Sequence, residues 1–285
     1  MSRIVYLNGE YLPEADAHVS IFDRGFLFAD AVYEVTSVLG GKLIAFDGHA
    51  VRLQRSVDEL GMNYKVDMDE LLDIHRQLVE RNSLEEGMIY LQLTRGNPGD
   101  RDFVYPAQDT TPTLVLFTQT ANLLNNPKIN TGMKVITVED QRWARRDIKT
   151  TQLLFPSMAK MMAKAAGVDD AWMFEDGAIT EGSSNNAYIV KDGKIITRHL
   201  GNEILHGITR AAVLKFAKSA QMEVEERAFT VEEAKNADEA FITSASTFVM
   251  PVVEVDGQAL GDGKPGSVAA RLREIYLDES LKQAI

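Results

Sequence analysis

The densest group of ionisable side chains is the segment RWARRDIKT at residues 142–150. It contains three arginines and one lysine: Arg142, Arg145, Arg146 and Lys149. One interpretation is a solvated basic edge, because most charge clusters lie on an exposed face. The other is a lysine whose pKa is lowered by neighbouring cations and partial burial. Since only the neutral amine attacks an aldehyde, that environment suits a lysine that forms a Schiff base.

Several other segments carry residues that could bind a ligand. Glu181 begins the run EGSSNN, which by itself indicates a turn with a surface carboxylate. In HGITR, Thr209 is either a helix N-cap or, together with the N–H groups of the helix start, a phosphate ligand. The small residues TSAST at 243–247 let a backbone approach a ligand closely. Tyr33 and Arg52 are further candidates that carry no signal by themselves.

The composition excludes several classes of function. The net charge of −12 argues against a nucleic-acid binder, whose surface must be basic, but still permits a pocket for a small anion. The absence of cysteine excludes disulfides, thiolate metal sites and thiol nucleophiles. The five histidines have no ligand spacing, so we expect no metal. With no signal-peptide pattern and no long apolar run, we expect a cytoplasmic protein that does not span a membrane.

Periodicity and turn residues outline the elements that must position these side chains. In the first 120 residues, strands are expected at 4–7, 88–94 and 113–118, and helices at 47–60 and 67–81. Asn8 and Gly9 predict a hairpin turn after the first strand. Asp67, with Glu70 three residues later, predicts the N-cap of the second helix.

The segment TANLLNNPKINTG, at residues 120–132, is rich in Asn and contains Pro and Gly, which is typical of an interdomain linker. After it, strands are expected at 135–138, 171–174, 186–190 and 195–197, and helices at 157–166, 209–220 and 268–276. We therefore predict two α+β domains rather than a doubly wound sheet. The smaller domain covers residues 1–120, the linker 121–131 and the larger domain 132–285.

Taken in order, the motifs resemble the D-amino-acid transaminases of the fold-type IV pyridoxal-phosphate enzymes. That order is Tyr33, Arg52, RRDIK ending at Lys149, TEGSSNN at Glu181, GITR at Thr209 and TSAST at Ser244. The resemblance runs nearly end to end and includes NGEYL near the start, YLQLTRG at 90–96 and PVVEVDG at 251–257. It implies the two-domain α+β fold of these enzymes and a pyridoxal-phosphate-dependent transaminase.

The resemblance also assigns roles to individual residues. Lys149 is expected to carry the cofactor as a Schiff base and to move the substrate proton. Glu181 is expected to pair with the pyridine nitrogen and keep it protonated, so that the ring acts as an electron sink. Leu205 is expected to pack on the ring. The phosphate is assigned to three parts of the chain, which are Arg52, the helix start at Ile208 and Thr209, and the small residues Ser244 and Ala245.

Substrate recognition is where the sequence departs from the family. The family uses the tyrosine that matches Tyr33, together with an arginine and a histidine two residues apart on a loop from the partner subunit. Here the loop at residues 95–106 is one residue longer. Arg101 aligns with the arginine, but Phe103 takes the place of the histidine and cannot donate to a carboxylate. Arg95 is one candidate to replace that donor.

The resemblance implies a homodimer that acts on a small amino acid and a 2-oxo acid. D-alanine and D-glutamate are the expected amino donors. Three enzymes of the same fold remain as alternatives: a branched-chain L-amino-acid transaminase, an (R)-selective amine transaminase and aminodeoxychorismate lyase. A catalytically silent cofactor-binding or structural protein is a fourth, against which the presence of both Lys149 and Glu181 argues.

Overall fold

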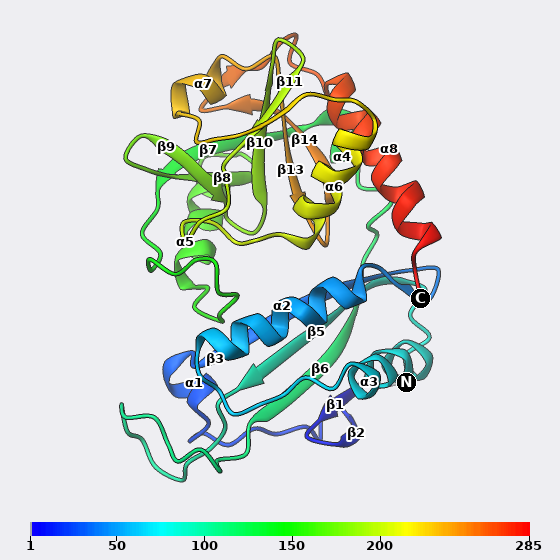
Figure 1. Cartoon of the computed structure of the whole chain (residues 1–285), viewed down its shortest axis with the longest axis vertical. Helices are drawn as coiled ribbons and strands as arrows, with labels where there is room; N and C mark the ends of the chain where they lie inside the picture. Colours follow the sequence, from blue (N-terminus) through cyan, green and yellow to red (C-terminus); the bar gives the residue numbers. More distant parts are fainter. Residues whose placement is uncertain (1) are drawn as a thin grey trace. The chain divides into compact units, whose positions relative to one another are not determined.

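The computed structural model describes residues 2–285 and divides them into two compact units (Figure 1). Unit 1 contains the residues up to Leu123 together with two short later segments, Ile148–Gln152 and Gln283–Ile285. Unit 2 contains Leu124–Asp147 and Leu153–Lys282. The chain first changes unit inside the segment expected to be a linker. No helix within residues 2–285 is long and apolar enough to cross a membrane.

Unit 1 is built on a six-stranded antiparallel sheet in the order β2-β1-β6-β5-β3-β4. Its strands are β1 (Ile4–Leu7), β2 (Glu10–Pro13), β3 (Ala31–Leu39), β4 (Lys42–Leu43), β5 (Glu86–Thr94) and β6 (Thr113–Thr120). Its helices are α1 (Arg24–Phe28), α2 (Phe46–Glu59) and α3 (Met68–Arg81). Helix α2 packs on β3, and α3 packs on β1 and β6.

Local sequence signals account for much of unit 1. Asn8 and Gly9 have positive φ angles of 48° and 99°, the geometry that a tight hairpin between β1 and β2 requires. Asp67 caps α3, where its side chain accepts hydrogen bonds from the backbone N–H groups of Asp69 and Glu70. The predicted helices and the three predicted strands are therefore confirmed within one or two residues. Strand β3 was not among the expected strands.

Unit 2 contains a nine-stranded mixed sheet in the order β12-β11-β10-β13-β14-β7-β8-β9, with β15 paired to β14. The strands are β7 (Met133–Glu139), β8 (Asp170–Glu175), β9 (Ala178–Gly182), β10 (Asn186–Lys191), β11 (Lys194–Thr197), β12 (Val224–Glu226), β13 (Glu239–Ser244), β14 (Phe248–Val255) and β15 (Gln258–Ala259). The helices are α4 (Lys128–Thr131), α5 (Leu154–Ala165), α6 (Ile208–Ser219), α7 (Val231–Lys235) and α8 (Ser267–Lys282). Both units mix helices with sheets that are largely antiparallel, as the α+β prediction requires.

Unit 2 differs from the sequence-based prediction at several elements. Strands β9, β12, β13, β14 and β15 and helix α7 were not expected, and helices α4 and α8 differ as well. Helix α4 lies within the expected linker, where Asn126 accepts a hydrogen bond from the backbone of Lys128. Helix α8 continues past the expected end at residue 276 to Lys282. Its first turn is held by the carboxylate of Glu239, which accepts from the backbone of Val268. Neither feature could be read from hydrophobic periodicity, because polar contacts stabilise both.

The position of Lys149 also corrects the prediction. We expected the larger C-terminal domain to carry this lysine, but Ile148–Gln152 belongs to unit 1. The backbone explains the assignment. The N–H of Tyr33 donates to the carbonyl of Lys149 at 3.0 Å, and the N–H of Thr151 donates to the carbonyl of Ala31 at 3.0 Å. The segment thus pairs with β3, which lies more than a hundred residues earlier in the chain.

Candidate active site

Unit 1 places Lys149 against an aromatic side chain. The Nζ atom of Lys149 lies 3.9 Å from the centre of the Tyr33 ring. Tyr33 projects from β3 and stacks on Tyr90 of β5, with ring centres 5.6 Å apart. The structure therefore brings together the residue expected to carry the cofactor and a residue expected to contact the substrate. The contact holds the amine over a ring face, as in other cation–π pairs.

Arg52 pairs with Glu34, which also binds His49, and the sequence singled out neither of these two residues. Its Nε and Nη2 atoms each lie 2.7 Å from a different oxygen of Glu34, and the Nδ1 of His49 lies 2.7 Å from Glu34 Oε2. All three side chains are buried. Burial by itself raises the pKa of the Glu34 carboxyl, but Arg52 and His49 outweigh it and lower that pKa to about 2. Glu34 therefore stays ionised and orients the guanidinium of Arg52.

Burial also acts on His49. It lowers the pKa of the imidazole, although the hydrogen bond to Glu34 opposes that effect. His49 and Arg52 are three residues apart on α2, so both reach the same neighbour. That spacing is the one signal in the sequence that could have identified the pair.

Unit 2 holds Glu181, at the end of β9, in a buried network of donors. Arg142 Nη1 lies 2.6 Å from Glu181 Oε1. The other oxygen accepts from Asn186 Nδ2 at 3.0 Å and from the backbone N–H of Leu205 at 3.1 Å. Burial raises the pKa of the Glu181 carboxyl, and Arg142 and the Leu205 N–H oppose this rise. The prediction of a surface carboxylate from the local sequence is wrong, because Glu181 is buried.

Arg142 is itself held in place by a second carboxylate. Its Nε and Nη2 atoms donate to the two oxygens of Asp140 at 2.9 and 2.7 Å. Asp140 also accepts from the hydroxyl of Thr180 at 2.8 Å. Burial favours the neutral forms of both Arg142 and Asp140, yet the charge of each partner raises the pKa of Arg142 and lowers that of Asp140. The guanidinium thus bridges two anions, of which Glu181 is one.

The other two arginines of the RWARRDIKT segment are paired as well. Arg145 Nε lies 2.9 Å from Asp147, and Arg146 Nη1 lies 2.8 Å from Glu175. The segment is therefore neither an exposed basic edge nor a group of cations without anionic partners, which were the two interpretations of its sequence. The prediction that these cations act on Lys149 lacks support, because each guanidinium has a carboxylate partner of its own.

The start of α6 offers an anion-binding geometry in unit 2. Gly207 is the N-cap, and within residues 2–285 no side chain caps this helix start, so the N–H groups of Ile208 and Thr209 point outward. Gly207 is required because a Cβ there would clash with the side chain of Asn186. Thr209 is not the N-cap. It is buried, and its hydroxyl bonds to Tyr276.

The turn between β13 and β14 contains the other residues assigned to the phosphate. Ser244 Oγ lies 2.7 Å from Thr247 Oγ1 and accepts from the Thr247 N–H at 3.1 Å. Ala245 follows directly, so the turn exposes only small side chains. Because α6 packs against β13, the helix start and this turn belong to one part of unit 2.

The loop that aligns with the family's carboxylate-binding loop lies in unit 1. Arg101 is exposed and its guanidinium lies near two rings, those of Phe28 and Phe103. Arg95 does not replace the missing histidine. Its guanidinium is buried, with Nε 2.8 Å from Asp30 and the other nitrogens bonded to the carbonyls of Leu60 and Gly61.

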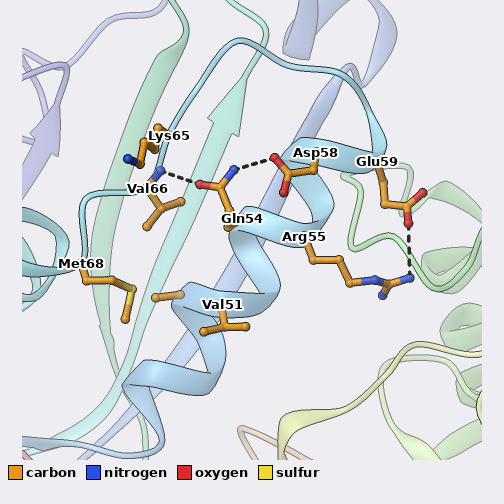
Figure 2. Close-up of a pocket in the computed structure, with 9 residues that line it drawn as sticks. Val51, Gln54, Arg55, Asp58, Glu59, Lys65, Val66 and Met68 are labelled. Atoms are coloured by element: carbon orange, nitrogen blue, oxygen red, sulfur yellow. Dashed lines mark hydrogen bonds and ion pairs between the residues drawn. The ribbon is translucent and has the colours of Figure 1, made fainter.

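A surface groove of about 1010 Å³ lies along α2. Figure 2 shows Gln54 among the lining residues, where its side chain donates to Asp58 and accepts from the backbone N–H of Val66. The groove is lined by basic side chains, Arg55 and Lys65, and by acidic ones, Asp58 and Glu59. None of the site residues predicted from the sequence lines it, so the groove is separate from the candidate active site.

The predicted site residues are thus divided between the units. Unit 1 holds Tyr33, Arg52, Arg101 and Lys149. Unit 2 holds Glu181, Leu205, Ile208, Thr209, Ser244 and Ala245. In unit 1, Lys149 contacts the ring of Tyr33, and in unit 2, Glu181 accepts a hydrogen bond from the backbone of Leu205. Sequence reasoning missed Glu34, His49 and Asp140, and had no role for Arg142 toward Glu181.

The known proteins that this chain resembles are aminotransferases. The family model described as amino-transferase class IV matches residues 31–255. A D-alanine aminotransferase of Staphylococcus aureus strain N315 is 38% identical over 270 residues, which cover 95% of each chain. A D-alanine aminotransferase of Bacillus licheniformis is 38% identical over 282 residues, covering 98% of this chain and 99% of the other.

Solved structures of branched-chain amino acid aminotransferases share the fold. The enzyme from Escherichia coli superposes with a TM-score of 0.90 at 22% identity, covering 98% of this chain and 95% of the other. An enzyme from T.th., solved with pyridoxamine 5'-phosphate, superposes with a TM-score of 0.89 at 26% identity, covering 99% and 95%. The first likeness concerns the fold alone. Sequence identity is higher to the D-alanine enzymes than to either of these.

Proposed function

This chain belongs to the class IV aminotransferase family and is a pyridoxal-phosphate-dependent enzyme, and from that membership we propose that it transfers the amino group of a D-amino acid to a 2-oxo acid. D-alanine and D-glutamate are the donors we expect. The observation that carries the proposal is the 38% identity, over nearly the whole chain, to curated D-alanine aminotransferases.

The residues of both units fit the cofactor. When bound, pyridoxal phosphate supplies the conjugated ring that takes up the electron pair released at the substrate α-carbon. Glu181 stands among donors that favour its anion, as a partner of a protonated pyridine nitrogen must. The uncapped start of α6 and the Ser244 turn suit the phosphate, and Arg52 is the cation assigned to it. Leu205 is assigned to the ring face.

Lys149 performs the proton transfer in this proposal. Its amine would hold the cofactor covalently and, as a free amine, would take the proton from the substrate α-carbon. Tyr33 supports this role by holding the amine against its ring and by presenting a hydroxyl to the substrate carboxylate. Arg101 contributes the positive charge for that carboxylate.

Stereochemistry tests the function. With the pyridoxal form of the enzyme, we expect D-alanine to bleach the cofactor band at least about 100-fold faster than L-alanine, a difference of roughly 2.7 kcal/mol in barrier. L-leucine serves as the second comparison, because the fold neighbours act on branched-chain amino acids by name. Faster bleaching by L-leucine than by D-alanine would assign this chain to the branched-chain activity and contradict the proposal.

We also infer a homodimer. Unit 1 exposes Ile21, Phe26 and Val104, each at 67% or more, and α5 of unit 2 exposes Leu154 and Met161. Large apolar side chains exposed to this extent are candidates for contact with a second copy of the chain. Sedimentation at micromolar concentration should give twice the 31.6 kDa of one chain. A mass of one chain at that concentration would contradict the inference.

The remaining partners follow from the reaction. The substrates are small metabolites, and we place the enzyme in the cytoplasm, where amino acids and 2-oxo acids are interconverted. The net charge of −12 speaks against nucleic acid as a partner. We assign no membrane partner.

A further inference from the structure

Two aromatic rings flank the guanidinium of Arg101. Its Cζ atom lies 4.8 Å from the centre of the Phe103 ring and 5.0 Å from that of Phe28. The two rings also contact each other, with centres 5.3 Å apart. These separations are those of cation–π contacts. Phe103, the residue that departs from the family's histidine, is therefore placed to act on Arg101.

The backbone on either side of Phe103 is anchored by a buried cation. Arg24 Nη1 donates to the carbonyl of Asp102 at 2.6 Å and to that of Val104 at 3.3 Å. Arg24 Nε is fixed by Asp30 Oδ2 at 2.7 Å. Charge-assisted hydrogen bonds of this length are strong, and Arg24 is only 3% exposed. The position of Phe103 is thus set by an interior residue.

A second buried cation holds the next turn of the loop. Arg95 binds the same Asp30 oxygen, and its Cζ lies 3.8 Å from the centre of the Tyr105 ring. Residues 95–112 form neither a helix nor a strand. Their conformation between Asp102 and Tyr105 is nevertheless fixed by side chains, so Arg101 extends from a supported loop.

The guanidinium of Arg101 is available to a ligand. Within residues 2–285 it forms no ion pair and no hydrogen bond, in contrast to Arg24 and Arg95. Stacking on ring faces leaves the in-plane N–H groups free to bind a carboxylate bidentately. It also restricts the rotamers of Arg101 before a ligand arrives, which reduces the entropy lost on binding.

We propose that Phe103 and Phe28 are positioning residues that hold Arg101 for the substrate carboxylate. Their stacking on Arg101 compensates for the hydrogen bond that the family's histidine would donate. This proposal rests on the proposed function for the identity of the substrate. It adds a specificity determinant that the family pattern does not contain. A substrate without a carboxylate gains nothing from Arg101, so discrimination in favour of carboxylates depends on the stack.

The test compares ring removal with ring retention. Phe103→Leu should raise KM for D-glutamate, and the dissociation constant of the unreactive dicarboxylate glutarate, about 3-fold to 10-fold while kcat is kept. Phe103→Tyr keeps the ring face and should retain wild-type values. Phe22→Leu makes the same change at an exposed phenylalanine for which no arginine contact is seen within residues 2–285, and serves as the matched control. Turnover of (R)-1-phenylethylamine should stay unchanged throughout.

A double-mutant cycle shows whether Phe103 works through Arg101. In an Arg101→Met background, Phe103→Leu should have no further effect on glutarate binding. The Nε–H resonance of Arg101 should move when Phe103→Leu removes one ring current. Equal losses in both backgrounds, or an unmoved resonance with unchanged glutarate affinity, would overturn the proposal.

The same measurements distinguish the positioning role of Phe103 and Phe28 from the proposed transaminase function. If wild-type enzyme preferred an L-amino acid, the proposed function would fail, yet the glutarate cycle and the resonance would still report on the Arg101 stack. If D-amino-acid turnover were normal and the cycle showed no coupling, only the positioning role would be lost.

Discussion

We expect Lys149→Ala to abolish transamination, with a loss of more than about 10⁴-fold, because under the proposed function it removes both the covalent attachment of the cofactor and the base at the substrate α-carbon. The fold should remain. The pairing of this segment with β3 uses the backbone carbonyl of Lys149, which alanine keeps. The measurement is turnover of D-alanine, with circular dichroism to verify folding.

The control for this variant is another lysine. Lys65 is exposed on the α2 groove, so Lys65→Ala should leave turnover unchanged. After borohydride reduction of the wild-type enzyme, peptide mapping should find the pyridoxyl group on the peptide that contains Lys149. A label on a different lysine would refute the assignment.

Glu181→Gln should lower the rate by two or more orders of magnitude, about 3 kcal/mol of barrier, while the cofactor stays bound. A neutral amide cannot keep a pyridine nitrogen protonated, so the ring withdraws electrons less strongly. The change is nearly isosteric, but of the two carboxylates that pair with Arg142, Asp140 and Glu181, only that of Asp140 remains charged. The rate of D-alanine turnover and the absorbance of bound cofactor measure the two effects separately.

Glu175→Gln is the matched control. Glu175 also pairs with an arginine of the same segment, Arg146, but it lies partly exposed. It has no contact with Glu181 among residues 2–285, so the activity of this variant should be unchanged. Full activity of Glu181→Gln would mean that another group partners the pyridine nitrogen.

Short-range physics made a large part of the fold predictable from the sequence alone. The Asn8-Gly9 turn and the Asp67 cap depend on residues at most three positions apart, and the structure contains both. Helix α6 was expected for the same reason, from a glycine followed by an apolar period. The order of motifs around Lys149, Glu181 and Thr209 identified the family, which the family model and the relatives confirm.

Contacts between residues far apart in the chain were beyond the reach of the sequence. Glu181 meets Arg142 across 39 residues, and Arg24 meets the carbonyl of Asp102 across 78. Lys149 lies in unit 1 because its backbone pairs with β3, although the chain on both sides of Ile148–Gln152 belongs to unit 2. Local patterns record neither pairing nor burial at such separations, and burial is what turns a charged residue such as Glu181 or Arg142 from a solvated group into half of an ion pair.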